Sequence, residues 1–287
     1  MTPPACVAVL ALAVLPAQGE AAAREAIRIA SFNIQAFGTA KAQDERVMAV
    51  LARIARRFDV MAVQELRDES GEVPGLFLAE INRRARDPYA MIVGPRLGRS
   101  ASKEQYVIYY RTDLVEFVDS FTVRDTGDRF ERPPLVARFV AGEFDFRLIV
   151  VHIRPDDAAA ELAALARLAA VVEEPEEGDV IILGDLNADC DYFNSAGQDH
   201  PLQRPRFHWA IPTGTRTAVR TECAYDRILL MEGTAGHEFV PNSARVFRYD
   251  REFRITSRAL IRAVSDHYPV FAEYRITGPD DDGPRRR

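Results

Sequence analysis

The sequence predicts an α+β fold, a four-layer α/β/β/α sandwich of two mainly antiparallel sheets with outer helices. The chain has 287 residues, of which 47% are hydrophobic, so it can bury a substantial core in one domain. Apolar segments with the pattern of strands and segments with the pattern of amphipathic helices occur in both halves of the chain. Two strand-rich halves, each with helices on its outer side, imply a sandwich of four layers.

The amino terminus is predicted to be a secretory signal peptide that covers residues 1–23. Its apolar run, residues 5–16, is too short to span a bilayer, and small residues that suit signal peptidase follow it. No Lys or Arg precedes the run, so the charge of the amino terminus serves alone. We therefore expect a protein secreted to the periplasm or the extracellular space, without membrane association.

The first half of the mature chain is predicted to open with a strand over residues 26–34, and a second buried strand follows over residues 60–65. Between them lies a helix, whose apolar residues recur at the spacing of one helical face. These residues are Val47, Leu51, Ile54 and Phe58. The other elements expected in this half are a helix over 75–86 and strands over 89–93, 106–111, 114–123 and 135–140.

The second half has the same pattern of strands that end in polar residues. A strand over residues 144–152 ends in His152, and an alanine-rich helix follows Pro155. The apolar run from Val180 leads into Asp185 and Asn187. Further strands are expected over 225–230 and 268–276. Side chains two apart on a strand point the same way, so the carboxylate of Asp185 and the amide oxygen of Asn187 can converge on one hard cation.

Polar side chains lie at or just beyond the predicted strands, and the sandwich brings them to one rim. The set is Asn33, Glu65, Glu104, His152, Asp185, Asn187, Asp226, Asp266 and His267. Oxygen ligands with two histidines and no cysteine suit Mg²⁺ better than Zn²⁺, and we expect Mn²⁺ or Ca²⁺ to substitute for it or assist it. Such a site favours hydrolysis of phosphate esters, since histidines can deprotonate a water or protonate a leaving oxygen.

Charge and cysteine content narrow the class of protein further. A formal net charge of -6 excludes a protein that coats DNA through overall basicity, but not a nuclease whose cations and local arginines offset its carboxylates. Removal of the signal peptide removes Cys6 and leaves Cys190 and Cys223 as an even pair in an oxidising compartment. We expect one disulfide, which would stabilise the fold by about 3 to 4 kcal/mol.

Four short motifs carry many of these polar residues, namely Ser31–Ile34, Val63–Arg67, Gly184–Asn187 and Ser265–Pro269. They resemble motifs of the endonuclease/exonuclease/phosphatase superfamily. Other segments resemble the secreted deoxyribonuclease I branch of that family, namely Lys103–Tyr106, Val151–Pro155, Asn187–Cys190, Trp209–Pro212 and Cys223–Ile228. Because they follow the family's order over most of the chain, residues 24–277 are identified as one domain of this kind. Residues 278–287, rich in Asp and Arg, are predicted to be a disordered tail.

The resemblance implies a role for each polar residue of the rim. His267 with Asp226 would activate a water, and His152 with Glu104 would protonate the leaving 3′-oxygen; the opposite assignment stays open. Each acid would orient its imidazole and raise its pKa. The residues that would hold or surround the cation and the scissile phosphate are Glu65, Asp185, Asn187, Asp266 and Asn33.

The resemblance also implies the substrate, which is double-stranded DNA cut with low sequence specificity to 5′-phosphate and 3′-hydroxyl ends. Arg67 and Arg132 align with arginines that approach the minor groove and the scissile strand, where they read shape and charge. Gln35 and Asn187 would add substrate contacts at the same rim. We expect a monomer that does not bind actin.

Two departures from the family limit the resemblance. Ser102 stands where the mammalian enzyme has a tyrosine that contacts the DNA groove. Residues 213–221 lack the acidic residue of the family's structural calcium loop, so we do not expect calcium there.

Two other functions remain open at this stage. One is a phosphodiesterase or phosphatase that acts on lipid or inositol phosphates, because the superfamily shares its catalytic core. The other is a binding module that has kept the fold without catalysis. The disulfide motif and Arg67 favour DNA, and the complete set of expected catalytic residues favours an enzyme.

Overall fold

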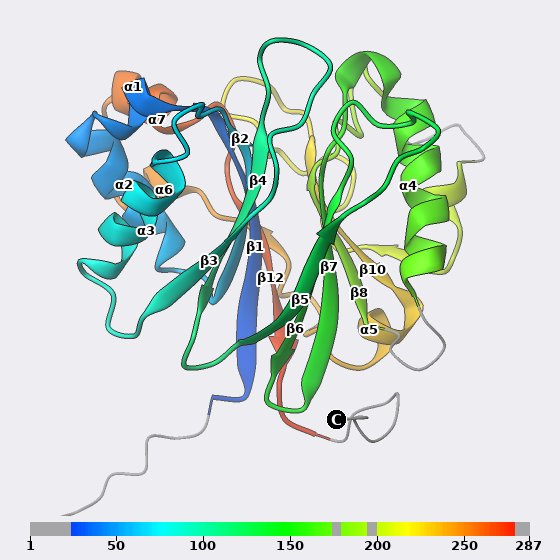
Figure 1. Cartoon of the computed structure of the whole chain (residues 1–287). Coiled ribbons are helices and arrows are strands. Elements are labelled where there is room, and N and C mark those ends of the chain that lie inside the picture. Colours follow the sequence, from blue (N-terminus) through cyan, green and yellow to red (C-terminus); the bar gives the residue numbers. More distant parts are fainter. Residues whose placement is uncertain (1–23, 174–178, 194–199, 279–287) are drawn as a thin grey trace, which may run out of the picture.

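The computed structural model describes residues 24–173, 179–193 and 200–278, and shows two six-stranded sheets packed face to face between outer helices (Figure 1). The predicted four-layer α+β sandwich is therefore confirmed. The predicted signal peptide and residues 279–287 of the predicted tail lie outside the described residues. In the described part of the chain, no helix has both the length and the apolar character needed to cross a bilayer.

The first sheet contains most of the amino-terminal half and the last strand of the chain. In spatial order its strands are β11 (Arg245–Val246), β12 (Val270–Arg275), β1 (Ala26–Phe37), β2 (Val60–Leu66), β4 (Gln105–Arg111) and β3 (Tyr89–Val93). Only β1 and β2 pair in parallel; the other neighbours are antiparallel. The outer helices of this sheet are α1 (Thr39–Ala42), α2 (Glu45–Ala55), α3 (Val73–Asn82), α6 (Tyr249–Glu252) and α7 (Arg258–Val264).

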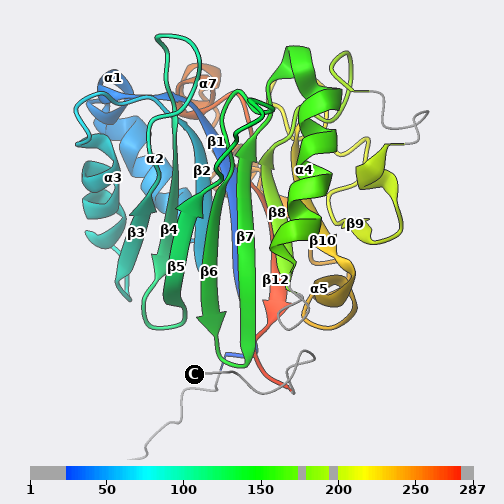
Figure 2. The same cartoon turned by 45° about the vertical axis from the view of Figure 1, so that its right-hand side comes forward.

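The second sheet has a matching arrangement. In spatial order its strands are β5 (Glu116–Thr122), β6 (Leu135–Ala141), β7 (Phe144–His152), β8 (Val180–Asp185), β10 (Asp226–Met231) and β9 (Phe207–Trp209). Again a single pair, β7 and β8, is parallel. Helix α4 (Ala158–Val172) covers its outer face, as Figure 2 shows, and α5 (Glu232–Gly236) lies near the end of the sheet.

Alternating side chains of each strand pack on opposite faces of its sheet. In β1, Ile27 and Ile29 lie in the core between the sheets, whereas Ala30 and Phe32 pack against the helices of the first sheet. Leu162 and the other apolar residues of α4 form a third core against the second sheet. All five residues are fully buried, so each sheet has two dry faces and the strands can be apolar throughout.

Strand direction explains why polar residues collect at one rim. The parallel pairs β1–β2 and β7–β8 end at this rim, so their carboxyl ends supply Asn33, Glu65, His152 and Asp185. The antiparallel strand β10 starts there, with Asp226 directly opposite Asp185. The fold thus delivers side chains that are remote in sequence to one place.

The long elements match the sequence-based expectations closely, and the short ones were missed. The missed elements are β9, β11, α1, α5, α6 and α7, each of two to seven residues. Segments this short show no clear hydrophobic period, and tertiary contacts decide their conformation.

Gly184 of β8 is required by close packing. Its φ is 154°, and a Cβ built on it would lie 1.7 Å from the carbonyl oxygen of Val151 in β7. Gly184→Ala should therefore force the two strands apart and lower the free energy of unfolding by about 3 kcal/mol in urea titrations. Gly75→Ala in α3 is a matched control, since nothing lies within 4 Å of the added Cβ; it should be neutral or stabilise by about 0.5 to 1 kcal/mol. Equal effects of the two variants would contradict the packing argument.

Candidate active site

Asp185 lies at the centre of the rim, at the end of β8. Its Oδ2 is 3.6 Å from Nε2 of His152 and 3.7 Å from Nε2 of His267. The histidines come from different places, His152 from the end of β7 and His267 from the segment before β12. The structure therefore brings the two predicted catalytic histidines together, with their Nε2 atoms directed to one carboxylate.

Glu104, which precedes β4, holds the ring of His152. Nδ1 of His152 lies 2.8 Å from Oε2 of Glu104, and the backbone N–H of His152 donates to the hydroxyl of Tyr106 at 3.0 Å. Desolvation acts to raise the pKa of Glu104, but the hydrogen bond and charge of His152 and two nearby arginines outweigh it, so this pKa is lowered. Glu104 is therefore charged at neutral pH and fixes the tautomer of His152, leaving Nε2 for chemistry.

Asp226, the first residue of β10, holds the ring of His267. Nδ1 of His267 lies 2.8 Å from Oδ2 of Asp226, a fully buried carboxylate. Burial disfavours the imidazolium, but the charges of Asp226 and two further carboxylates outweigh it and raise the pKa of His267 to about 10. In the metal-free protein this ring carries a proton at neutral pH. A cation bound among the same carboxylates would offset their charge and lower this pKa.

Two hydroxyl residues that the sequence interpretation did not assign support the second pair. The hydroxyl of the buried Thr217 accepts the backbone N–H groups of Tyr225 and Asp226 at 3.0 and 3.1 Å. The hydroxyl of Ser265 donates to the carbonyl oxygen of Asn33 at 2.7 Å and accepts the backbone N–H of His267. Ser265 lies within a motif quoted above, but no sequence signal points to Thr217, whose segment becomes adjacent only in the fold.

The amide of Asn33 links the two sheets at the rim. Its Nδ2 donates to Oδ2 of Asp185 at 2.9 Å and to Oε1 of Glu65 at 3.1 Å, while its Oδ1 accepts the backbone N–H of Gln35. The side chain of Gln35 in turn donates to Oδ2 of Asp266 at 2.7 Å. The side chain of Gln35 thus orients a predicted cation ligand.

Three residues at or beside the rim have a strained backbone. Ala36, Glu65 and Asn187 have φ values of 48°, 59° and 46°, in the left-handed region that non-glycine residues rarely adopt. The register of β1 on β2 shifts between Asn33 and Phe37, which is the bulge that contains Ala36. Such conformations cost about 1 to 3 kcal/mol each and persist where surrounding contacts over-determine them, as they do at this rim.

The predicted disulfide between Cys190 and Cys223 is present, with a Cα–Cα distance of 5.9 Å. It joins the turn after Asn187 to the segment that precedes Asp226. Oδ2 of Asp189 accepts the backbone N–H of Ala224 at 2.7 Å beside it. The covalent bond and the hydrogen bond therefore hold together the segments that flank the rim ends of β8 and β10.

The acidic residues of the rim fit a hard cation. In the part of the chain that the structure describes, Asp185, Asp226 and His267 offer ligand atoms that all lie within 4.8 Å of one another. Oδ1 of Asp226 and Oδ1 of Asp266 are buried and accept no hydrogen bond from any described residue. Buried carboxylate oxygens without partners are costly, and an oxygen-rich donor set suits Mg²⁺ or a similar ion. Asp226 belongs to this cluster, although the sequence interpretation gave it only to His267.

The two arginines predicted to contact substrate lie differently. The guanidinium of Arg67 is 36% exposed and bridges Oε2 of Glu65 at 2.9 Å and Oε1 of Glu104 at 3.2 Å. Arg132 is only 11% exposed; it pairs with Glu104 at 3.3 Å and donates to the carbonyl oxygen of His152. Arg67 therefore bridges two carboxylates of the rim and remains partly exposed to solvent, whereas Arg132 points inward and braces the first histidine pair.

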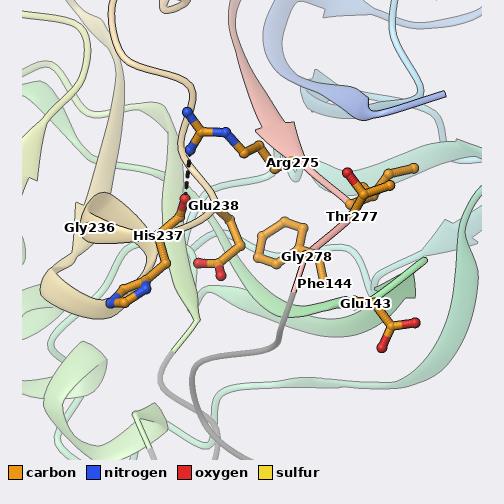
Figure 3. Close-up of a pocket in the computed structure, with 9 residues that line it drawn as sticks. Glu143, Phe144, Gly236, His237, Glu238, Arg275, Thr277 and Gly278 are labelled. Carbon is orange, nitrogen blue, oxygen red and sulfur yellow. Dashed lines mark hydrogen bonds between the residues drawn. The ribbon is translucent and has the colours of Figure 1, made fainter.

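A hollow lies at the end of the sandwich away from the rim (Figure 3). It is lined by Glu143 and Phe144 where β7 begins, by residues 236–238, and by residues 275–278 at the end of β12 that is remote from His267. Arg275 donates there to the carbonyl oxygen of His237 at 2.8 Å. None of the predicted site residues lines this hollow.

Comparison with known proteins shows the family of the chain. The model of the endonuclease/exonuclease/phosphatase family matches residues 30–267. The chain belongs to this family. Within it the chain is deoxyribonuclease I-like: it is 36% identical to human deoxyribonuclease-1 over 256 residues, or 85% of this chain and 90% of that protein. It is likewise 36% identical to the rabbit enzyme over 85% of this chain and 91% of that protein, and 37% identical to deoxyribonuclease-1-like 1 of Chlorocebus aethiops over 88% and 86%.

Solved structures of lower sequence identity share the fold. A humanized Danio rerio TDP2 with 14 mutations superposes with a TM-score of 0.61 at 18% identity, covering 87% of this chain and 98% of that one. The human Nocturnin catalytic domain gives a TM-score of 0.60 at 13% identity, covering 87% and 93%. The arrangement of the two sheets is thus common to proteins whose sequences have diverged widely.

Asp226→Asn should lower the pKa of His267 from about 10 toward 6.5 in the metal-free protein. Asparagine keeps an oxygen that can accept from Nδ1 but removes the charge that raises the pKa most. The pKa is measured from ring-proton NMR signals against pH in the presence of a chelator. Asp119→Asn, an exposed change in β5, should leave the titration unchanged.

The same pair determines a pH dependence of stability. In the folded protein the pKa of His267 is about 10, above the ordinary value of 6.5. The protonated ring therefore stabilises the folded state fully below about pH 6.5, and this contribution is lost as the pH rises through about 10. The melting temperature of the chelated protein should fall over this range, and fall less in Asp226→Asn. A variant in which His267 still titrates near pH 10 would rule out Asp226 as the main cause.

Proposed function

We propose that the protein is a secreted, divalent-metal-dependent endonuclease that hydrolyses phosphodiester bonds of double-stranded DNA with low sequence specificity. The observation that carries the proposal is the pair of histidines that face Asp185, each backed by its own carboxylate. The deoxyribonuclease relatives, which match about 85% of the chain, support DNA as the substrate. The same relatives make lipid or inositol phosphates the less favoured substrates.

The two histidines would move the protons of the reaction. His267, paired with Asp226, takes a proton from the attacking water, and His152, paired with Glu104, gives a proton to the leaving oxygen. The water oxygen bonds to phosphorus while the bond from phosphorus to the 3′-oxygen breaks, which leaves a 5′-phosphate and a 3′-hydroxyl. The opposite assignment is the alternative, and the raised pKa of His267 favours it until a cation offsets the carboxylate charge.

The cation would be held by carboxylates at the ends of the strands. The residues proposed to hold or surround it are Glu65, Asp185, Asp266, Asn33 and Asn187. When bound, Mg²⁺ supplies positive charge that offsets the charge of the scissile phosphate, with Mn²⁺ or Ca²⁺ as substitutes. The amide of Asn33 keeps Glu65 and Asp185 in place beforehand, since it donates to both.

The arginines divide the task of binding the substrate. Arg67, which is 36% exposed, would meet the DNA backbone or minor groove, where charge and shape matter more than base identity. Arg132 would act at the scissile phosphate, because its guanidinium lies against the Glu104–His152 pair. Contacts of this kind give low sequence specificity.

The disulfide supports the proposed secretion of the protein, to the periplasm or outside the cell. Disulfides persist in oxidising compartments, and this one joins the only two cysteines of residues 24–287. We also propose that the protein acts as a monomer and does not bind actin.

A plasmid-nicking assay tests the proposed activity. The purified protein should nick supercoiled DNA with Mg²⁺ and lose this activity with EDTA. His152→Ala should reduce the rate about a thousandfold, because a general acid or base is lost. His208→Ala, which removes an exposed histidine from β9, should not change it. If the folded protein does not nick DNA, or cleaves a lipid phosphodiester faster, the proposed DNA endonuclease function is wrong.

The identity of the general acid can be tested with a 3′-bridging phosphorothiolate in the DNA. A sulfur leaving group departs without a proton, so this substrate should restore most of the rate to His152→Ala and little to His267→Ala. The ratio of rates on the sulfur and oxygen substrates is measured for each variant. Rescue of His267→Ala in place of His152→Ala would establish the opposite assignment.

A further inference from the structure

Lys41 occupies an unusual position beside the rim. It lies on α1, and its ammonium donates to three backbone carbonyl oxygens: Ile34 at 3.1 Å, Gln35 at 2.5 Å and Val264 at 3.1 Å. Most surface lysines keep their charge in water, whereas the side chain of Lys41 is partly buried. Its three N–H groups therefore each have a partner within the protein.

The three carbonyl groups lie in two segments where the regular hydrogen bonds of the strand and the helix end. Ile34 and Gln35 lie where the register of β1 on β2 shifts, so their carbonyls fall outside the regular ladder. Strand β12 pairs with β1 only as far as Ser31. Val264 is the last residue of α7, where a carbonyl has no partner within the helix and a cation is favourable. Lys41 satisfies all three groups with one atom.

Both segments carry proposed catalytic residues immediately beside the contacts. Asn33 precedes Ile34, and the run Ser265–His267 follows Val264. Two further hydrogen bonds join the same segments, from Ser265 to the carbonyl of Asn33 at 2.7 Å and from Gln35 to Asp266 at 2.7 Å. The ammonium therefore acts at the joint between the Asn33 bulge and the segment that carries His267.

The choice of lysine over arginine is informative in this chain. Lys41 and Lys103 are the only lysines among 37 basic residues. An ammonium is a compact point charge whose three donors diverge from one nitrogen, whereas a guanidinium is a planar fork that suits carboxylates and phosphates. Three carbonyl oxygens around one point therefore fit an ammonium group better than a guanidinium group.

We propose that Lys41 is a positioning residue of the active site, which sets the place of Asn33 and His267 by binding the carbonyls of Ile34, Gln35 and Val264. This inference rests on the proposed nuclease function only for its kinetic consequences. Burial lowers the pKa of Lys41 to about 8, against the charges of Asp266 and Glu65, so the ammonium form predominates below that pH.

The first test uses the unaltered protein and needs no activity. Labelling with ¹⁵N-lysine gives two ammonium signals, one from each lysine, and Lys103→Arg assigns them. At pH 6.5 the Lys41 protons should exchange with water at least about tenfold more slowly than those of the exposed Lys103, because carbonyls hold them. Equal exchange rates would overturn the proposal, whether or not the protein cuts DNA.

The second test separates position from charge and from stability. Lys41→Met and Lys41→Arg should each lower kcat for plasmid nicking about tenfold or more with KM within twofold, and should shift the ring signals of His267 in chelated protein. Arg251→Met, which removes an exposed charge in α6, should do neither. Lys41→Gln provides a substitute if Lys41→Met does not fold.

Each other outcome contradicts the proposal. Full activity in Lys41→Arg would show that charge alone suffices. A rise in KM with unchanged kcat would make Lys41 a DNA contact. A lower melting temperature with unchanged kcat and unchanged His267 signals would leave Lys41 a purely structural role.

Discussion

The hydrogen bonds of one amide hold the two halves of the active site together. Asn33 ends the regular part of β1 in the first sheet, and its Nδ2 donates both to Glu65 of the neighbouring strand and to Asp185 of the second sheet. Below the rim the sheets meet through apolar side chains, which set their separation but not the orientation of polar groups. At the rim, the pairs Glu104–His152 and Asp226–His267 also join elements of the two sheets. The hydrogen bond from Asn33 to Asp185 therefore makes the positions of the polar groups at the rim depend on how the two sheets pack.

This bridge has to work against charge repulsion. Glu65, Asp185, Asp226 and Asp266 lie close together at the rim, and like charges in a partly buried place destabilise the fold unless donors or cations offset them. The structure supplies imidazoles for Asp185 and Asp226, an amide for Asp266 and a guanidinium for Glu65. The strained backbone at Glu65 and Asn187 is a further cost of the arrangement. The rim therefore lowers the stability of the fold, and in return its charged groups lie close enough together to bind a cation and a phosphate.

The sequence predicted the long strands and helices well because their hydrophobic period is set by two buried faces. The run from Val180 to Asp185 and the alanine-rich helix after Pro155 are examples, and both are present as β8 and α4. The polar ends of those strands, including His152 and Asp185, identified the rim. The short elements α1 and α7 had no such period, yet they carry Lys41 and lead into Asp266. Local sequence alone therefore missed the segments that brace the site.

By itself the sequence determined the sandwich, the rim, the two cysteines that pair and the residue types that suit a cation and two proton-transfer groups. The hydrophobic period of a strand and the chemistry of a side chain are local properties, so they can be predicted from the amino-acid sequence alone. Only the tertiary structure decided that Arg132 points inward to Glu104, that Asp226 joins the candidate cation cluster, and that Thr217 and Lys41 bind backbone groups of the segment that carries His267. These contacts join residues more than twenty positions apart or depend on strain and burial, which arise only when distant segments pack together.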